Sequence, residues 1–162
     1  MTRKSVDELW SGLEAFLQYG YVQQDSFSDP NDEATDWLAQ LYVDSPTHAL
    51  LYCKRILEAP ALHESVKAYA LDFLLLSSER NYAYHYLSEE AVHLSIPELE
   101  KAFFYFSCDT PDPIPDGLFV KLLARFEVVK CAPDACFYHL HETYNDFVKA
   151  LSDKLVRSSG NG

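Results

Sequence analysis

The sequence predicts an all-helical protein, and three observations support this fold class. Apolar residues recur at intervals of three and four through most of the chain, the period of helices with one buried face. Capping residues precede several of these stripes, and no segment shows sustained period-two alternation between hairpin turns. With 162 residues, 48% of them hydrophobic, the chain is long enough for one well-buried core. We expect a single helical domain over residues 1–162, with about seven or eight helices and a flexible tail at 157–162.

Two helices are expected in the first 45 residues. Ser5 and Glu8 have the spacing of a capping box, in which each side chain accepts a hydrogen bond from the backbone of the other residue. An apolar stripe follows and ends at Gly20. The segment 21–33 is polar and rich in turn residues, and a second apolar stripe then predicts a helix over 34–42.

The next two helices are separated by a proline. Ser45 and Pro46 supply an N-cap and a first helical residue for a helix that ends at Ala59 and Pro60. A strongly apolar stripe over 62–77 predicts a fourth helix, which we expect to be central to the fold.

A tyrosine-rich helix is expected over 79–87, followed by a short connection or helical turn at 88–94. Ser95 and Glu98 then repeat the capping-box spacing and predict a helix that reaches Phe106.

Three prolines and three aspartates between 108 and 116 predict the clearest loop of the chain, because proline removes backbone donors and breaks helices. A helix is expected over 118–126. One long amphipathic helical stretch is expected from Asp134 to Leu155.

Two arrangements of these helices fit the pattern: a compact bundle, or antiparallel pairs stacked as a short right-handed superhelix. The segment 49–76 resembles a HEAT-type repeat, in which a proline-marked turn joins two amphipathic helices of similar length. The segment 99–126 looks like a degenerate second copy about fifty residues later, near the repeat period of such families. This resemblance implies a short HEAT-like superhelix, and the bundle is the alternative.

Negative charge is concentrated rather than spread along the chain. The net charge is −12 and the pI is near 4.7. The segment 5–53 has nine carboxylates and no Lys or Arg, and 81–120 has seven carboxylates and one lysine. This balance argues against nucleic-acid or anionic-membrane binding, which needs clustered bases. It favours a basic protein partner, and solubility alone is the alternative explanation.

Four cysteines in a chain of this size do not resemble a disulfide scaffold, so we expect reduced thiols. The first ten residues reach Asp7 and Glu8 before any apolar signal region forms, and no apolar run approaches the roughly 20 residues of a membrane span. The sequence therefore predicts a cytoplasmic protein.

Two segments contain residue types that bind metals, and neither has the right spacing. Cys131, Cys136, His139 and His141 lie within eleven residues, but the two cysteines run directly into one helix instead of forming separate ligand pairs. We expect buried thiols there. The segment 29–40 begins like a calcium loop but has Ala34 and Gln40 where glycine and glutamate are needed. No metal and no cofactor are predicted.

The chain also lacks the local motifs of common enzymes. It has no nucleophile elbow, no phosphate or dinucleotide glycine pattern, and no paired metal histidines on a helix. We predict a non-catalytic protein. An enzyme would require a cleft that brings His85 or His93 near carboxylates.

Tyrosines are concentrated at Tyr82, Tyr84 and Tyr86. In a helix Tyr82 and Tyr86 share a face, while Tyr84 lies on a different side of the helix. We therefore expect at least one exposed ring. Tyrosine is enriched at interface centres, although these rings are equally suited to filling grooves between helices.

Small, acidic, all-helical chains without a leader are similar to bacterial immunity proteins of contact-dependent or polymorphic toxin systems. This resemblance in size, charge and helix pattern implies an inhibitor that masks a basic toxin, such as a nuclease, and a monomer or weak dimer. Charge and aromatic placement give the expected partner-binding residues: Asp25, Asp29, Asp32, Glu33, Asp36, Tyr82, Tyr84, Asp109, Asp112 and Asp116. The alternative is a helical adaptor, or a homodimer that packs through Trp37, Tyr42 or the C-terminal helix.

Overall fold

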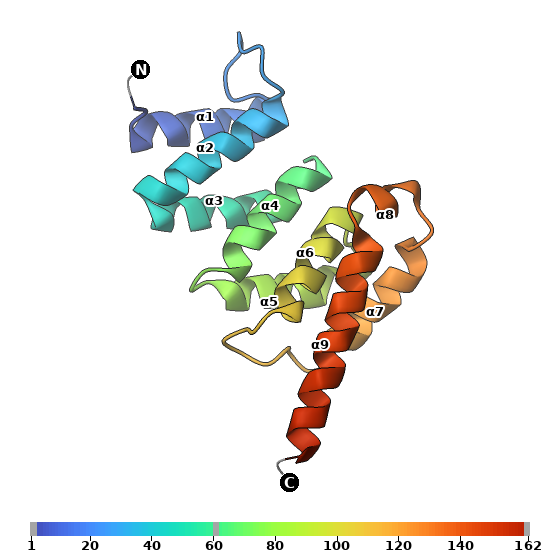
Figure 1. Ribbon diagram of the computed structural model, residues 1–162. Coiled ribbons are helices and arrows are strands. Elements are labelled where there is room, and N and C mark those ends of the chain that lie inside the picture. The colour runs from blue at the N-terminus through green and yellow to red at the C-terminus, as the bar shows by residue number, and fades with distance from the viewer. Residues whose placement is uncertain (1–2, 60–61, 161–162) are drawn as a thin grey trace. The chain divides into compact units, whose positions relative to one another are not determined.

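The computed structural model describes residues 3–59 and 62–160, and every regular element in these ranges is a helix (Figure 1). The all-helical prediction is confirmed. The described residues hold nine α-helices and one short 3₁₀ helix, slightly more than the seven or eight expected. Contacts divide the chain into two compact units, Met1–Glu79 and Arg80–Gly162, here called the N-terminal and C-terminal units. The single domain remains a prediction.

The N-terminal unit consists of four helices in sequence: α1 (Val6–Tyr19), α2 (Pro30–Asp44), α3 (Pro46–Glu58) and α4 (Glu64–Leu75). Each helix packs on the next, and α2 also contacts α4 (Figure 1). The Ser5 hydroxyl caps α1 by accepting a hydrogen bond from the Glu8 N–H. Gly20 ends α1 in the left-handed conformation that glycine adopts without strain. Both predicted ends of the first helix are therefore confirmed.

The core of the N-terminal unit depends on close packing at Gly12. A Cβ atom at this position would meet the Trp37 ring at 2.2 Å and Val22 at 2.8 Å. Tyr52 of α3 is fully buried, and its hydroxyl donates to the Leu13 carbonyl of α1 at 2.8 Å. These contacts join α1, α2, α3 and the connection between α1 and α2 into one packed unit.

The C-terminal unit contains α5 (Arg80–Glu90), η1 (Ala91–His93), α6 (Ile96–Ser107), α7 (Leu118–Val129), α8 (Pro133–Phe137) and α9 (Leu140–Gly160). The most extensive packing joins α6 and α9, which lie side by side in Figure 1. Aromatic rings fill this contact, with Phe103 of α6 touching Phe147 and Tyr144 of α9. The predicted capping box of α6 is complete, because Ser95 and Glu98 each accept from the other's backbone N–H.

The structure corrects the long C-terminal stretch. His139 has a left-handed φ of 56° and separates α8 from α9, so the stretch is two helices and Cys136 does not share a helical face with His139. The cysteines Cys131 and Cys136 are exposed, and the expectation of buried thiols there is wrong. The short helix α8 buries only Ala135. At the other end, α9 continues through Gly160 into the segment where a tail was expected.

Two further helix starts differ from expectation. Helix α2 begins at Pro30 rather than at residue 34, because the Asp29 side chain accepts from the backbone N–H groups of Asn31 and Asp32. Ser45 precedes α3 as predicted, but its hydroxyl lies 2.6 Å from His48 Nδ1 and makes no capping bond to the backbone.

The HEAT-like pattern stays a prediction. Helices α3 and α4 pack against each other as its first copy requires, while the marking Pro60 lies outside the described residues. In the second copy, α6 contacts α7 but packs mainly against α9.

Candidate functional site

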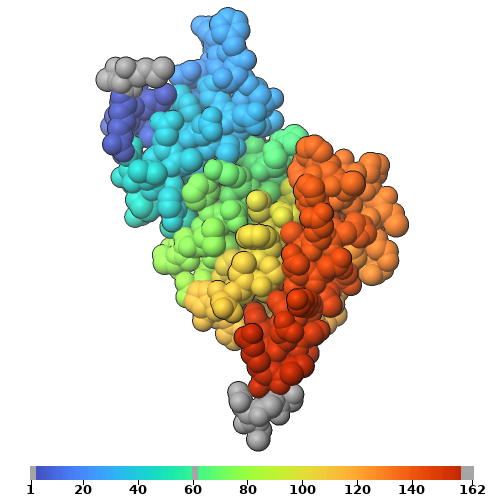
Figure 2. Space-filling model, viewed as in Figure 1, coloured from blue at the N-terminus to red at the C-terminus, as the bar shows by residue number. Residues whose placement is uncertain are grey.

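The connection between α1 and α2, residues 21–29, projects from the N-terminal unit (Figure 2). Its first part is fixed by Val22, which is buried beside Gly12. Its last residue, Asp29, is held by its capping bonds to the start of α2, with distances of 2.9 and 3.2 Å from Oδ1 to the two backbone nitrogens. The segment is therefore an ordered loop, here called the acidic loop.

Glu33 ties the middle of the acidic loop to α2. The Ser26 hydroxyl donates to Oε2 of Glu33, and the Ser28 N–H donates to Ser26 Oγ at 3.2 Å. Glu33 is only 9% exposed, and within the described residues its Oε1 atom has no hydrogen-bond partner. The sequence grouped Glu33 with the partner-binding carboxylates, but its burial assigns it to holding the loop.

The remaining predicted carboxylates of this unit face solvent. Asp25, Asp29, Asp32 and Asp36 are all exposed and are here called the acidic surface. Asp32 and Asp36 are four residues apart on α2, so they share one face of the helix. Within the described ranges, no Lys, Arg or His forms an ion pair with any of the four.

Other carboxylates of the N-terminal unit already have partners. Asp44 is paired with Arg3, and Glu14 is paired with Arg55 at 3.1 Å. Among the described residues, exposed carboxylates without an ion pair lie on the acidic loop and the adjoining half of α2, and also at Asp7, Glu8 and Glu64.

An exposed aromatic side chain, which the sequence analysis missed, lies within the acidic loop. Phe27 has a relative exposure of 108%, higher than any other exposed large hydrophobic side chain of the described residues. Its signal in the sequence is a lone phenylalanine in a polar, turn-rich segment, where no helical period assigns it to a core.

The predicted residues of the C-terminal unit divide into three environments. Tyr84 is buried, with its hydroxyl 2.7 Å from that of Tyr105, so it belongs to the core. Tyr82 is half-buried on α5. Asp112 pairs with Arg80 at 2.5 Å, while Asp109 and Asp116 are exposed in the loop between α6 and α7.

The expectation of at least one exposed ring among Tyr82, Tyr84 and Tyr86 is wrong. Tyr82 and Tyr86 are both half-buried, and none of the three rings is fully exposed. Tyr86 donates to Glu98, the capping residue of α6, at 2.5 Å. The alternative that these rings fill grooves between helices therefore fits Tyr84 and Tyr86.

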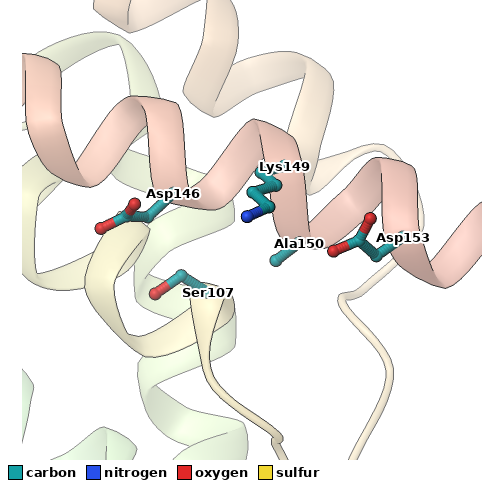
Figure 3. Close-up of a pocket in the computed structure, with 5 residues that line it drawn as sticks. All are labelled: Ser107, Asp146, Lys149, Ala150 and Asp153. Carbon is teal, nitrogen blue, oxygen red and sulfur yellow. The ribbon is translucent and has the colours of Figure 1, made fainter.

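A shallow polar hollow of about 320 Å³ lies between the end of α6 and α9. Figure 3 shows Lys149 between Asp146 and Asp153 along α9, with Ser107 opposite. The Ser107 hydroxyl donates to the Phe104 carbonyl at 2.7 Å. The other polar side chains that line the hollow are Asp146, Lys149 and Asp153 of α9.

The titratable groups with the largest pKa shifts lie away from this hollow. Burial raises the pKa of the Cys53 thiol to about 12 and also raises the pKa of Tyr52, Tyr84 and Tyr86. The raised pKa values keep these thiol and phenol groups uncharged near pH 7. Acid–base catalysis uses the opposite kind of shift, which brings a pKa closer to the operating pH. His85 and His93 are exposed and do not line the hollow.

A second hollow, of about 190 Å³, is mostly apolar and lies between η1 and α7. It is lined by Val92, Lys121, Ala124, Arg125 and Val128. Lys121 and Arg125 are held by the carbonyl groups of Ser88 and Leu94, at 3.1 and 2.9 Å.

In the part of the chain that the structure describes, no group of three or more His, Cys, Asp or Glu residues is arranged to hold a metal ion. In the same part, no helix combines the length and apolar character needed to cross a membrane. No protein-family model matches the sequence, and no curated protein matches it at a significant level.

Proposed function

We propose that this protein is a non-catalytic inhibitor that binds a basic protein through its acidic surface, in the manner of bacterial immunity proteins that mask a cognate toxin. The observation that carries the proposal is the exposure of Asp25, Asp32 and Asp36 without ion-pair partners among the described residues. Their counterpart on the partner is a cluster of Lys and Arg, such as that of a nuclease active site.

The charge of the N-terminal unit supports rapid encounter with such a partner. Its 79 residues contain thirteen carboxylates and five Lys or Arg, a formal charge of −8, against −4 for the C-terminal unit. A concentrated field of one sign steers an oppositely charged protein over roughly a Debye length, which is about 8 Å at physiological salt.

The acidic surface is compatible with a stable fold. Asp29 and Asp32 lie at the N-terminus of α2, where the helix dipole favours negative charge.

Asp109 and Asp116 provide a further acidic site in the C-terminal unit. Four free cysteines support action in a reducing compartment, the cytoplasm.

The test is the salt dependence of association combined with charge reversal. The triple variant Asp25→Lys, Asp32→Lys, Asp36→Lys is expected to lower the association rate constant by roughly tenfold at low salt, because it removes the steering charge. Stopped-flow or surface plasmon resonance kinetics with the captured basic partner measures it.

A matched control separates this surface from net charge. The variant Glu89→Lys, Glu90→Lys, Asp153→Lys makes the same change in net charge at exposed positions of the C-terminal unit. Equal slowing by both triple variants, or binding that is independent of salt, would contradict the assignment of the acidic surface.

A helical adaptor or self-associating protein is the second candidate, and the exposed Leu155 of α9 favours it. Trp37 is buried and Tyr42 is half-buried against Phe73, so the C-terminal helix is the most exposed of the three dimer contacts expected from the sequence. Light scattering would favour this candidate if the mass rises from that of a monomer to that of a dimer as the protein concentration increases. The Leu155→Lys variant should then remain a monomer.

A further inference from the structure

We propose that Phe27 is the hydrophobic anchor of the acidic surface, and that it inserts into an apolar pocket rimmed by Lys or Arg on the basic partner. This inference rests on the proposed function and deepens it, since it names the side chain that holds the complex together after the charges have brought the partner close. The kind of partner surface also becomes specific: a cationic surface with an aromatic-sized hollow.

The first support is the exposure of the ring. Phe27 is fully exposed, while the neighbouring apolar residue of the same loop, Val22, is buried. The loop thus packs against its own unit through Val22 and through Tyr21, which stacks on Tyr19, but leaves the ring of Phe27 uncovered. A phenylalanine ring in water gains more than almost any other side chain when a partner covers it.

The second support is the ordered backbone that presents the ring. The Ser26 hydroxyl donates a hydrogen bond to buried Glu33, and the Ser28 N–H donates one to Ser26 Oγ. Hydrogen bonds therefore hold the residues on both sides of Phe27. Asp29 fixes the end of the loop as the N-cap of α2. A pre-ordered loop loses little conformational entropy on binding, so more of the ring's burial contributes to affinity.

The third support is charge complementarity, which decides the kind of occupant. Asp25 and Asp29 flank Phe27 at two residues on either side, and both are exposed. A pocket that takes the ring must therefore accept two carboxylates at its rim, which Lys and Arg do. An arginine at the rim also packs over the ring face as a cation–π contact. The same carboxylates are repelled by the negative surface of an anionic bilayer.

The experiment uses the full chain as bait in four forms: the natural sequence, Phe27→Ala, the triple variant of the acidic surface, and Phe137→Ala. Phe137 is 74% exposed on α8. The Phe137→Ala variant is therefore the matched control, because it removes an exposed ring from the other unit. Phe27→Ala and Phe137→Ala are expected to melt at the temperature of the natural sequence, since each change lies at an exposed side chain. The triple variant is expected to melt slightly lower, because Asp32→Lys places a positive charge in the first turn of α2. Proteins captured from lysate of the natural source at low salt and released at high salt are identified, and the one that the triple variant fails to retain is purified.

Kinetics with that purified protein separate the two roles. Phe27→Ala is expected to raise the dissociation rate constant roughly tenfold or more and to leave the association rate constant within about twofold, because anchors act mainly after encounter. The triple variant is expected to lower the association rate constant roughly tenfold and to change the dissociation rate constant much less. Phe137→Ala is expected to change neither rate constant.

Three results would overturn the anchor, and they identify which proposal fails. If no retained protein depends on the acidic surface, the proposed function fails and the anchor with it. If the partner depends on the acidic surface but dissociates from Phe27→Ala as slowly as from the natural chain, only the anchor fails. Binding to phosphatidylglycerol vesicles that disappears in Phe27→Ala would assign the ring to a membrane instead.

Discussion

At the scale of single residues, Gly12 is a position where the packing leaves no room for a larger side chain. It lies within α1, where alanine would ordinarily favour the helix by about 1 kcal/mol. A Cβ atom would nevertheless meet the Trp37 ring at 2.2 Å, and the ring is enclosed by the core. The close approach of α1 and α2 therefore depends on the missing side chain.

We expect Gly12→Ala to lower the free energy of unfolding by about 2 kcal/mol, because overpacking forces Trp37 or the helix to move. Urea unfolding followed by Trp fluorescence measures this change. Gly20→Ala is the control, since that glycine has open space around it but a φ of 85°; it should cost about 1 kcal/mol through backbone strain alone. A Gly12→Ala protein as stable as the natural one would contradict the packing at Trp37.

At the scale of elements, the start of α2 joins stability to the proposed binding. Asp29 is both the N-cap of the helix and a member of the acidic surface. Its side chain fixes where the acidic loop ends and α2 begins. Cap and charge are separable, because asparagine retains the acceptor oxygen while losing the charge.

We expect Asp29→Ala to lower the free energy of unfolding by about 1 kcal/mol, the usual cost of a lost N-cap. Asp29→Asn should keep nearly all of the stability. Thermal or urea unfolding by circular dichroism makes the comparison. If both substitutions destabilise the protein equally, the carboxylate charge rather than the cap stabilises α2.

At the scale of the whole molecule, both units bury neutral acids that resist ionisation. Cys53 and Tyr52 lie in the N-terminal unit, and Tyr84 and Tyr86 in the C-terminal unit, and burial raises the pKa of each. For Cys53 the pKa rises from 9.0 to about 12. The folded chain therefore keeps protons that the unfolded chain releases in alkali.

We expect the free energy of unfolding to be unchanged by this thiol below pH 9 and to fall between about pH 9 and 12. Above pH 9 the unfolded state binds fewer protons, so one such group gives a slope of about −1.4 kcal/mol per pH unit. Urea unfolding between pH 7 and 11 measures the slope. Cys53→Ala should make it shallower, and an unchanged slope would show that the tyrosines alone account for it.

The sequence alone determined the elements whose signals are local. Ser5, Gly20, Ser95 and the three prolines of the α6–α7 loop act within one turn of the backbone, and the helix ends they mark were predicted correctly. The break at His139 was not, because the amphipathic period continues across the left-handed residue that separates α8 from α9.

Which carboxylates and rings are free was decided only by the tertiary structure. Asp25, Asp29, Asp32 and Asp36 were predicted and are exposed, but Glu33 and Tyr84 lie on the same stretches of sequence and are buried. Phe27 was missed because it lies among polar turn residues, where no period indicates whether a side chain is covered or exposed. Charge and composition are properties of the chain and can be read from it, whereas exposure depends on which distant residues cover each side chain when the helices pack.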